Sequence, residues 1–163
     1  YYGAIADYTK AIEINPNYAY AYNNRGSAKE KLKDYYGAIA DYTKAIEINP
    51  NYVYAYNNRG SAKDKLKDYY GAIADYAKAI EINPNYANAY YNRGNTNLDL
   101  KDYYAAISDY TKAIEINPNF ANAYNNRGVT KEKKGDLNGA CADWRKASSL
   151  GNDLATKSLR NQC

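Results

Sequence analysis

Histidine and methionine are absent from this chain of 163 residues, and phenylalanine and tryptophan occur only once each. Without histidine, the two cysteines lack the usual base of a nucleophilic site, and no His/Cys cluster is available for zinc. The chain also has no glycine-rich phosphate loop with its lysine. We therefore expect a non-enzymatic protein that needs no cofactor and no metal.

Long apolar runs are missing as well. No stretch approaches the ~18 apolar residues of a membrane-spanning helix, and the N-terminus lacks the charged-then-apolar pattern of a signal peptide. Membrane insertion is therefore not expected. Because the chain starts at Tyr1 in the middle of a repeating pattern, we interpret it as a fragment of a longer protein.

Tyrosine, by contrast, is abundant, with 22 residues in a chain that is 45% hydrophobic. This apolar content is sufficient for a buried core, so disorder is not expected. The net charge of +4 is distributed over interspersed acidic and basic residues. Such a charge gives only weak support for an anionic partner.

The chain repeats itself at an interval of 34 residues. The segment "YYGAIADYTKAIEINPNY" occupies residues 1–18 and again 35–52, and close variants begin at Tyr69 and Tyr103. A period of this length is typical of stacked arrays in which each unit cannot bury its apolar face alone.

Each unit is predicted to contain two helices. In the first complete unit they span about 19–32 and 35–49, the second helix being stopped by Pro50. The second helix has an apolar stripe at helical spacing, and an aspartate stands before it as N-cap. The stripe is Ala38, Ile39, Tyr42, Ala45, Ile46 and Ile48, and the N-caps are Asp34, Asp68, Asp102 and Asp136.

The 34-residue period, together with Tyr22, Gly26, Ala38, Tyr42, Ala45 and Pro50 and their equivalents, resembles the tetratricopeptide repeat family over nearly the whole chain. The fourth unit keeps Tyr124, Gly128, Ala140 and Ala147 but has Trp144 and Gly151 in place of tyrosine and proline. The resemblance implies an all-α fold, a right-handed α-solenoid (superhelix) of antiparallel helix pairs. It also implies that the first helices line a concave groove.

These boundaries divide the chain into a row of repeats with an incomplete one at the start. The expected segments are a lone second helix (1–18), repeats at 19–52, 53–86, 87–120 and 121–151, and a C-terminal capping helix (152–163). The lone helix has one apolar face without cover, so it is expected to fray or to recruit another copy of the chain.

An arginine on each first helix is aimed at the second helix, where the family usually has an apolar residue. A buried guanidinium requires a partner, and an aspartate follows each arginine at a constant spacing. The predicted structural ion pairs are Arg25 with Asp41, Arg59 with Asp75, Arg93 with Asp109, and Arg127 with Asp143. Lys33, Lys67 and Lys101 stand at a turn where the family favours glycine, and a left-handed backbone there would be strained.

Both cysteines, Cys141 and Cys163, lie in the C-terminal segment. Antiparallel packing about Gly151 would place them at a similar level, so a disulfide is possible. The alternative is one buried small residue and one loose terminal thiol, since two cysteines do not make a framework.

Opposite the core face, amides recur on one side of every first helix. An asparagine amide can bond both the N–H and the C=O of an extended peptide, so this side is the predicted peptide-binding groove. The alternative is a merely solvated polar face. The candidate residues are Tyr20, Asn23, Asn24, Ser27, Tyr54, Asn57, Asn58, Ser61, Asn88, Tyr91, Asn92, Asn95, Asn122, Asn125 and Asn126.

The predicted function is a protein–protein interaction scaffold that binds an extended peptide or a partner helix in the groove. These rows of amides resemble the ladders of asparagine side chains that hold extended peptides in the grooves of other superhelical proteins and of armadillo-type proteins. The family resemblance also implies a second binding mode, in which lysine and arginine side chains hold the acidic C-terminal tails of chaperones. That mode is not favoured here, because Asn23, Asn88 and Asn92 occupy positions where it needs cationic side chains. The alternatives are binding of single-stranded RNA, as in the related pentatricopeptide arrays, and self-assembly through the first helix.

Overall fold

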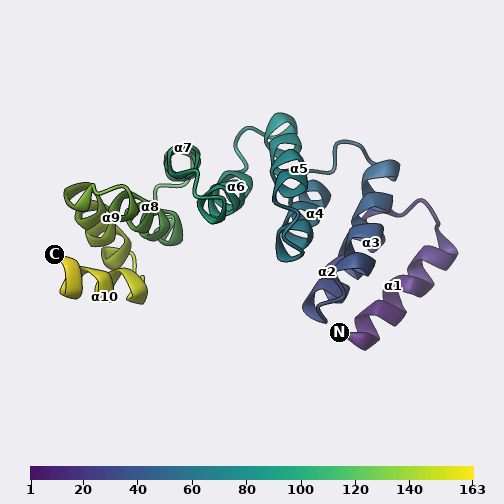
Figure 1. The fold of residues 1–163 in the computed structure, drawn as a ribbon. Coiled ribbons are helices and arrows are strands. Elements are labelled where there is room, and N and C mark those ends of the chain that lie inside the picture. Colours follow the sequence, from purple (N-terminus) through teal and green to yellow (C-terminus); the bar gives the residue numbers. More distant parts are fainter. The chain divides into compact units, whose positions relative to one another are not determined.

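The computed structural model describes residues 1–163, which form helices joined by short turns (Figure 1). None of the helices has the length and apolar character needed to cross a membrane. The helices are α1 (Tyr2–Ile14), α2 (Ala19–Lys31), α3 (Tyr35–Ile48), α4 (Val53–Lys65), α5 (Tyr69–Ile82), α6 (Ala87–Asp99), α7 (Tyr103–Ile116), α8 (Ala121–Lys133), α9 (Leu137–Ser149) and α10 (Asp153–Gln162).

The helices belong to two compact units, residues 1–84 and 85–163. In the first unit α2 pairs with α3 and α4 with α5, while α3 packs on α4 and α1 packs on α2. In the second unit α6 pairs with α7 and α8 with α9, while α7 packs on α8 and α10 packs on α9. The prediction of an all-α solenoid of antiparallel helix pairs with a 34-residue repeat is confirmed.

A Schellman-type turn joins the two helices of each pair. In the first pair the N–H of Asp34 bonds to the carbonyl of Lys29 and the N–H of Lys33 bonds to that of Glu30. The side chain of Asp34 then accepts from the N–H of Gly37, so this residue also caps the next helix. The φ angles of Lys33, Lys67 and Lys101 are 63°, 63° and 62°, which costs each non-glycine residue about 1 kcal/mol.

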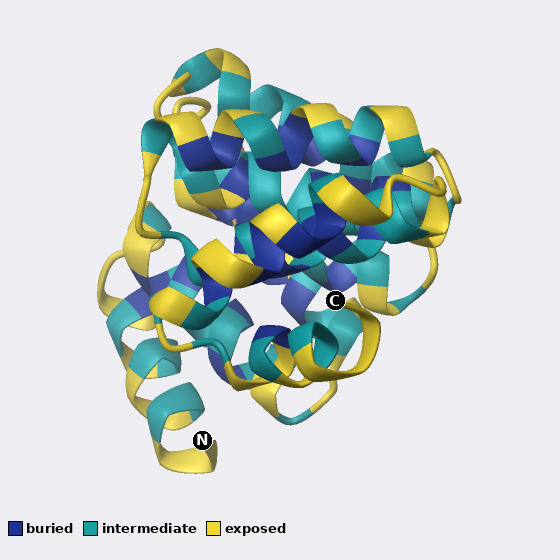
Figure 2. Ribbon diagram, turned by 90° about the vertical axis from the view of Figure 1, so that its left-hand side faces the viewer, coloured by how far each residue is buried: buried dark blue, intermediate teal, exposed yellow.

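The core of each pair is built from small residues around one large ring. Ala38, Tyr42 and Ala45 of α3 are fully buried, and Gly26 of α2 lies directly on the Tyr42 ring. A Cβ atom at Gly26 would lie 2.8 Å from Cε1 of Tyr42, so any larger residue would push the helices apart. Figure 2 shows the buried residues on the inner sides of the helices, with the turns exposed.

A buried carboxylate ties each first helix to its second helix. Nε of Arg25 donates to Oδ2 of Asp41 at 2.9 Å, and Nη2 donates to Oδ1 at 2.7 Å. Nζ of Lys29 lies 2.8 Å from the same carboxylate, which is 96% buried as a residue. The hydrogen bond with Asp41 raises the pKa of Arg25 above its usual value.

The other predicted partners are brought together in the same way. Arg59 lies on Asp75, Arg93 on Asp109 and Arg127 on Asp143, each through two hydrogen bonds. Lys63 and Lys131 repeat the role of Lys29, whereas the third repeat has Asn97, which donates to Asp109 at 3.0 Å. The arginines were predicted from the sequence, whereas this second donor was not.

The arginine also reaches the preceding second helix. Nη1 of Arg25 donates to Oγ1 of Thr9 in α1, and Nη1 of Arg59 donates to Oγ1 of Thr43 in α3, both at 3.1 Å. In the second unit Arg127 makes the same bond to Thr111 at 2.9 Å. Each of these guanidinium groups therefore joins three helices rather than two.

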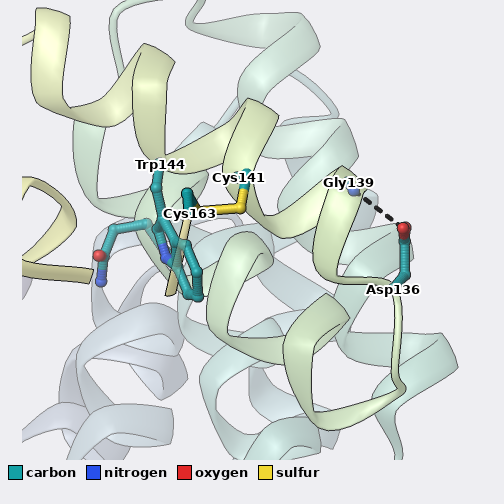
Figure 3. The surroundings of a disulfide bond; sticks show 6 residues. Asp136, Gly139, Cys141, Trp144 and Cys163 are labelled. Carbon is teal, nitrogen blue, oxygen red and sulfur yellow. Dashed lines mark hydrogen bonds between the residues drawn. A yellow bond between two sulfur atoms is a disulfide. The ribbon is translucent and has the colours of Figure 1, made fainter. Parts of the chain in front are cut away.

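The C-terminal helix α10 covers the last helix pair. Ala155 is buried against Ala140, Trp144 and Ala147 of α9, and Leu159 packs on the same cluster. Leu154 of α10 is 64% exposed, because it lies on the outer side of the helix. Cys141 of α9 and Cys163 form a disulfide, which fastens the free end of α10 (Figure 3).

Substitution at the ion pair of α4 and α5 tests the buried carboxylate. Replacing Asp75 by Leu leaves Arg59 and Lys63 without their shared anion and should lower the free energy of unfolding by about 3–5 kcal/mol. Replacing Arg59 and Asp75 together by Leu should cost much less, because Lys63 can turn to solvent. Urea titration measures both variants.

The control for this experiment lies on the same helix. Glu81→Ala breaks the exposed pair with Lys78 and should change stability by less than about 1 kcal/mol. Equal losses in Asp75→Leu and in the double variant would contradict the pairing.

Removal of the disulfide tests the cap. The bond closes a chain segment with a sequence separation of 22 residues, so Cys163→Ser should cost roughly 3 kcal/mol in the stability of the last helix pair. Amide exchange should quicken in α10 and leave α2–α5 unchanged. A mass change of about two daltons on reduction verifies the bond beforehand, and unchanged exchange in α10 would contradict its role.

Candidate functional site

The exposed sides of α2 and α4 present one repeated pattern, which we call the α2–α4 face: Tyr20, Asn24, Ser27, Tyr54, Asn58 and Ser61. Helical spacing puts each set of three on one side of its helix. The tyrosines are 53% and 56% exposed, whereas the amides and hydroxyls between them are half-buried. The face is therefore a polar strip edged by aromatic rings.

The amides of this face are bonded to one another across the two helices. Nδ2 of Asn58 donates to Oδ1 of Asn23 at 3.1 Å, and Nδ2 of Asn23 donates to Oδ1 of Asn24 at 3.2 Å. On α4, Nδ2 of Asn57 donates to Oδ1 of Asn58 at 3.4 Å. The asparagines thus form a continuous chain of hydrogen bonds that fixes their orientation.

The structure corrects the assignment of Asn23, Asn57 and Asn125 to the groove surface. These residues are only 6%, 7% and 7% exposed, because their side chains lie between neighbouring helices. A guest could not reach them. They hold the outer asparagines in place instead.

The second unit repeats the pattern with different partners. Asn88 is exposed on α6, and Asn92 and Asn95 are half-buried beside it. Nδ2 of Asn126 on α8 donates to Oδ1 of Asn95 at 2.9 Å and to the hydroxyl of Tyr91 at 3.1 Å. Both hydrogens of this amide are therefore engaged within the protein.

Two further predicted groove residues have structural partners. The ring of Tyr91 packs on Phe120, with 4.8 Å between centroids, and is half-buried. Oδ1 of Asn122 accepts from Nδ2 of Asn152, the N-cap residue of α10, at 2.9 Å. Both side chains therefore contribute to the packing of the second unit at the edge of the predicted groove.

Glu30 is a neighbour of the α2–α4 face that the sequence analysis did not assign to it. Its two carboxylate oxygens accept from the hydroxyls of Tyr42 at 2.9 Å and Ser61 at 3.0 Å. Burial, with the nearby carboxylate of Glu30, raises the pKa of Tyr42 above its usual value. The recurrence of an acid at Asp64, Asp99 and Glu132 was visible in the sequence, but the direction of the Glu30 side chain was not.

A hollow of about 360 Å³ opens where α1 meets α2. Its walls combine aromatic rings with the polar groups of the α2–α4 face, and one lysine lies at its edge. The lining residues are Tyr1, Ala4, Tyr8, Tyr20, Asn24, Ser27, Ala28 and Lys31.

Comparison with known proteins gives a consistent result. A family model described as tetratricopeptide repeat matches residues 19–52, 53–86 and 87–120, and related repeat models match residues 1–33 and 109–142. No match was found among curated proteins.

Several solved structures share the fold. A crystal structure of MamA is 28% identical, with a TM-score of 0.83 over 93% of this chain and 89% of that chain. The first TPR of Spaghetti (RPAP3), bound to the HSP90 peptide SRMEEVD, is 29% identical, with a TM-score of 0.70 over 72% of this chain and 93% of that chain. MamA 41-end from Desulfovibrio magneticus RS-1, at 22% identity and a TM-score of 0.80 over 90% and 82% of the two chains, shows the fold alone.

Proposed function

Because this chain belongs to the tetratricopeptide repeat family, we propose that it binds an extended peptide or a partner's helix on the α2–α4 face. The family is generally one of non-enzymatic protein-interaction scaffolds. The observation that carries the proposal is the row of oriented amides between the exposed rings of Tyr20 and Tyr54.

The amides of this face keep hydrogen-bonding capacity for a guest. Nδ2 of Asn24 donates to no residue of the chain, and Nδ2 of Asn58 uses only one of its hydrogens, on Asn23. Each Oδ1 accepts one bond and has a second lone pair free. Two amides on successive repeats could therefore each bond the backbone of an extended chain, and the hydrogen-bond chain behind them reduces the cost of ordering them.

The tyrosines would supply the apolar part of the contact. The ring of Tyr20 lies 5.9 Å from that of Tyr18, and the ring of Tyr54 lies 6.2 Å from that of Tyr52. Tyrosine offers a large contact area with little loss of rotamer freedom. A peptide that combines a free backbone with apolar side chains fits this surface.

An acidic C-terminal tail fits it less well. The peptide-bound neighbour carries the acidic sequence SRMEEVD. This chain has Asn23, Asn88 and Asn92 at the positions where a carboxylate clamp would need cations, and Asn23 is buried. Recognition of backbone rather than of terminal carboxylates is therefore the mode that we propose.

Selection from a random peptide library followed by fluorescence anisotropy tests this proposal. Replacing Tyr20, Tyr54 and Asn24 by Ala should weaken the selected peptide at least about tenfold, since each change removes a contact and leaves the core intact. Replacing Asn24 and Asn58 together by Ala should also weaken it, because this variant removes the amides of the face and leaves the tyrosines in place.

The matched control replaces exposed asparagines elsewhere, Asn138 and Asn161, by Ala and should leave the affinity unchanged. Urea titration of every variant separates lost binding from lost stability, because Asn58→Ala also removes the donor to Asn23. Full affinity in both the three-residue and the two-residue variants would reject the face as the binding site.

Single-stranded RNA is the alternative ligand for the same face. Lys31 and Lys65 are exposed at its edge, but the neighbouring acids Glu30 and Asp64 offset their charge. We expect only weak RNA binding, and a titration of fluorescent RNA over a salt series measures it. An affinity that falls steeply with salt, by more than about tenfold between 50 and 200 mM, would favour RNA over peptide.

A further inference from the structure

The excess positive charge of the chain lies in the last helix pair and the helix that covers it. Residues 1–120 contain fourteen lysines and arginines and fourteen aspartates and glutamates, whereas residues 121–163 contain eight and four. Two of these eight cations, Arg127 and Lys131, are paired with buried Asp143. The other six are exposed and make no ion pair: Lys133, Lys134, Arg145, Lys146, Lys157 and Arg160.

Two connections fix how α10 lies on α9. Cys141 is bonded to Cys163 near one end, and the hydroxyls of Ser148 and Thr156 lie 2.7 Å apart near the other. Seven residues separate the two connections on each helix, so α9 and α10 run antiparallel in one register. Residues between the connections can therefore be matched by level.

Arg145 and Arg160 occupy equivalent places between these connections. Arg145 lies four residues after Cys141 and Arg160 lies four residues after Thr156, so the two arginines stand at the same level on neighbouring helices. Helical spacing turns both away from the buried cluster around Trp144, to the same outer side. Both are exposed. Two guanidinium groups therefore leave one surface at one level.

Lys157 extends this positive surface. It lies three residues before Arg160, on the same side of α10, and is exposed. We call Arg145, Lys157 and Arg160 the α9–α10 basic surface. Asp153, the acid of α10, lies in the first turn of the helix and forms no ion pair with them. Neighbouring like charges destabilise one another, so a bound anion would relieve their repulsion.

We propose that the α9–α10 basic surface binds an acidic segment of a partner protein, whose aspartates or glutamates pair with Arg145, Lys157 and Arg160. A planar guanidinium matches a carboxylate through two parallel hydrogen bonds, and two guanidinium groups at one level suit a chain that crosses from α9 to α10. The site lies in the second unit, so it does not depend on the α2–α4 face.

The composition of the surface favours an acidic protein segment over a nucleic acid or a membrane. Single-stranded nucleic acids bind where aromatic side chains stack on their bases, and Trp144, the one aromatic residue of α9 and α10, is 1% exposed. A helix that lies on a membrane needs an apolar face, and Leu154 is the one large hydrophobic side chain exposed on α10. Pairing with carboxylates requires neither feature.

Fluorescence anisotropy of a short labelled oligoglutamate peptide with the full 163-residue chain tests the proposal. We expect saturable binding that weakens as salt rises. Arg145→Gln and Arg160→Gln should weaken it about threefold each and about tenfold together, because each removes a charge-assisted pair. Both arginines are exposed, so the variants should fold normally, and urea titration verifies this.

The matched control replaces Lys133 and Lys146 together by Gln. This variant removes the same charge from exposed positions of the second unit, and Lys146 lies about 100° round α9 from Arg145, outside the basic surface. Its affinity should fall by less than about twofold at physiological salt, where separated charges are screened. The three-residue variant of the α2–α4 face should bind the acidic peptide unchanged, which separates the two proposed sites.

Absence of saturable peptide binding up to about 1 mM would overturn the proposal. Equal losses in the two double variants would do so as well, since they would show attraction to net charge alone. The competing ligands are labelled single-stranded RNA and vesicles of phosphatidylcholine with phosphatidylserine. If either binds more tightly than the peptide and loses affinity in the Arg145→Gln, Arg160→Gln variant, the surface belongs to that ligand and the proposal is wrong.

Discussion

A carboxylate that is removed from water needs cations and donors around it, and this requirement organises every helix pair of the chain. Asp41 illustrates it: Arg25 and Lys29 surround one buried carboxylate, and the guanidinium continues to Thr9 on the preceding helix. The same group of atoms therefore holds a pair together and sets its neighbour's position. Because a large ring and a glycine pack beside each carboxylate, helix spacing is fixed at the same level.

On each first helix, the side that carries the asparagines lies opposite the side that packs on the second helix. In the first unit, buried Asn23 and Asn57 orient the outer asparagines through hydrogen bonds. In the second unit the side-chain amide of Asn126 donates one hydrogen to Tyr91 and the other to Asn95. The hydrogen bonds of the outer asparagines therefore differ between the two units, although the sequences of the units are similar.

The helices α1 and α3 have the same sequence but different neighbours. The same sequence is buried in α3, where α2 packs on it, and is more exposed in α1, which no preceding helix of the described residues covers. The disulfide and the buried Ala155 cover the last helix pair with a helix of different sequence.

The sequence by itself determined the helices, their pairing and the identity of the ion pairs, because these depend on a local period and on the rule that a buried charge needs a partner. Arg25 and Asp41 could be matched in this way before any coordinates were known. Only the tertiary structure decided that Asn23 is buried while Asn24 is accessible, and that Glu30 turns toward Tyr42. Neighbouring positions on a helix differ by about 100°, so the close approach of the next helix, which no local pattern contains, decides which of them reaches solvent.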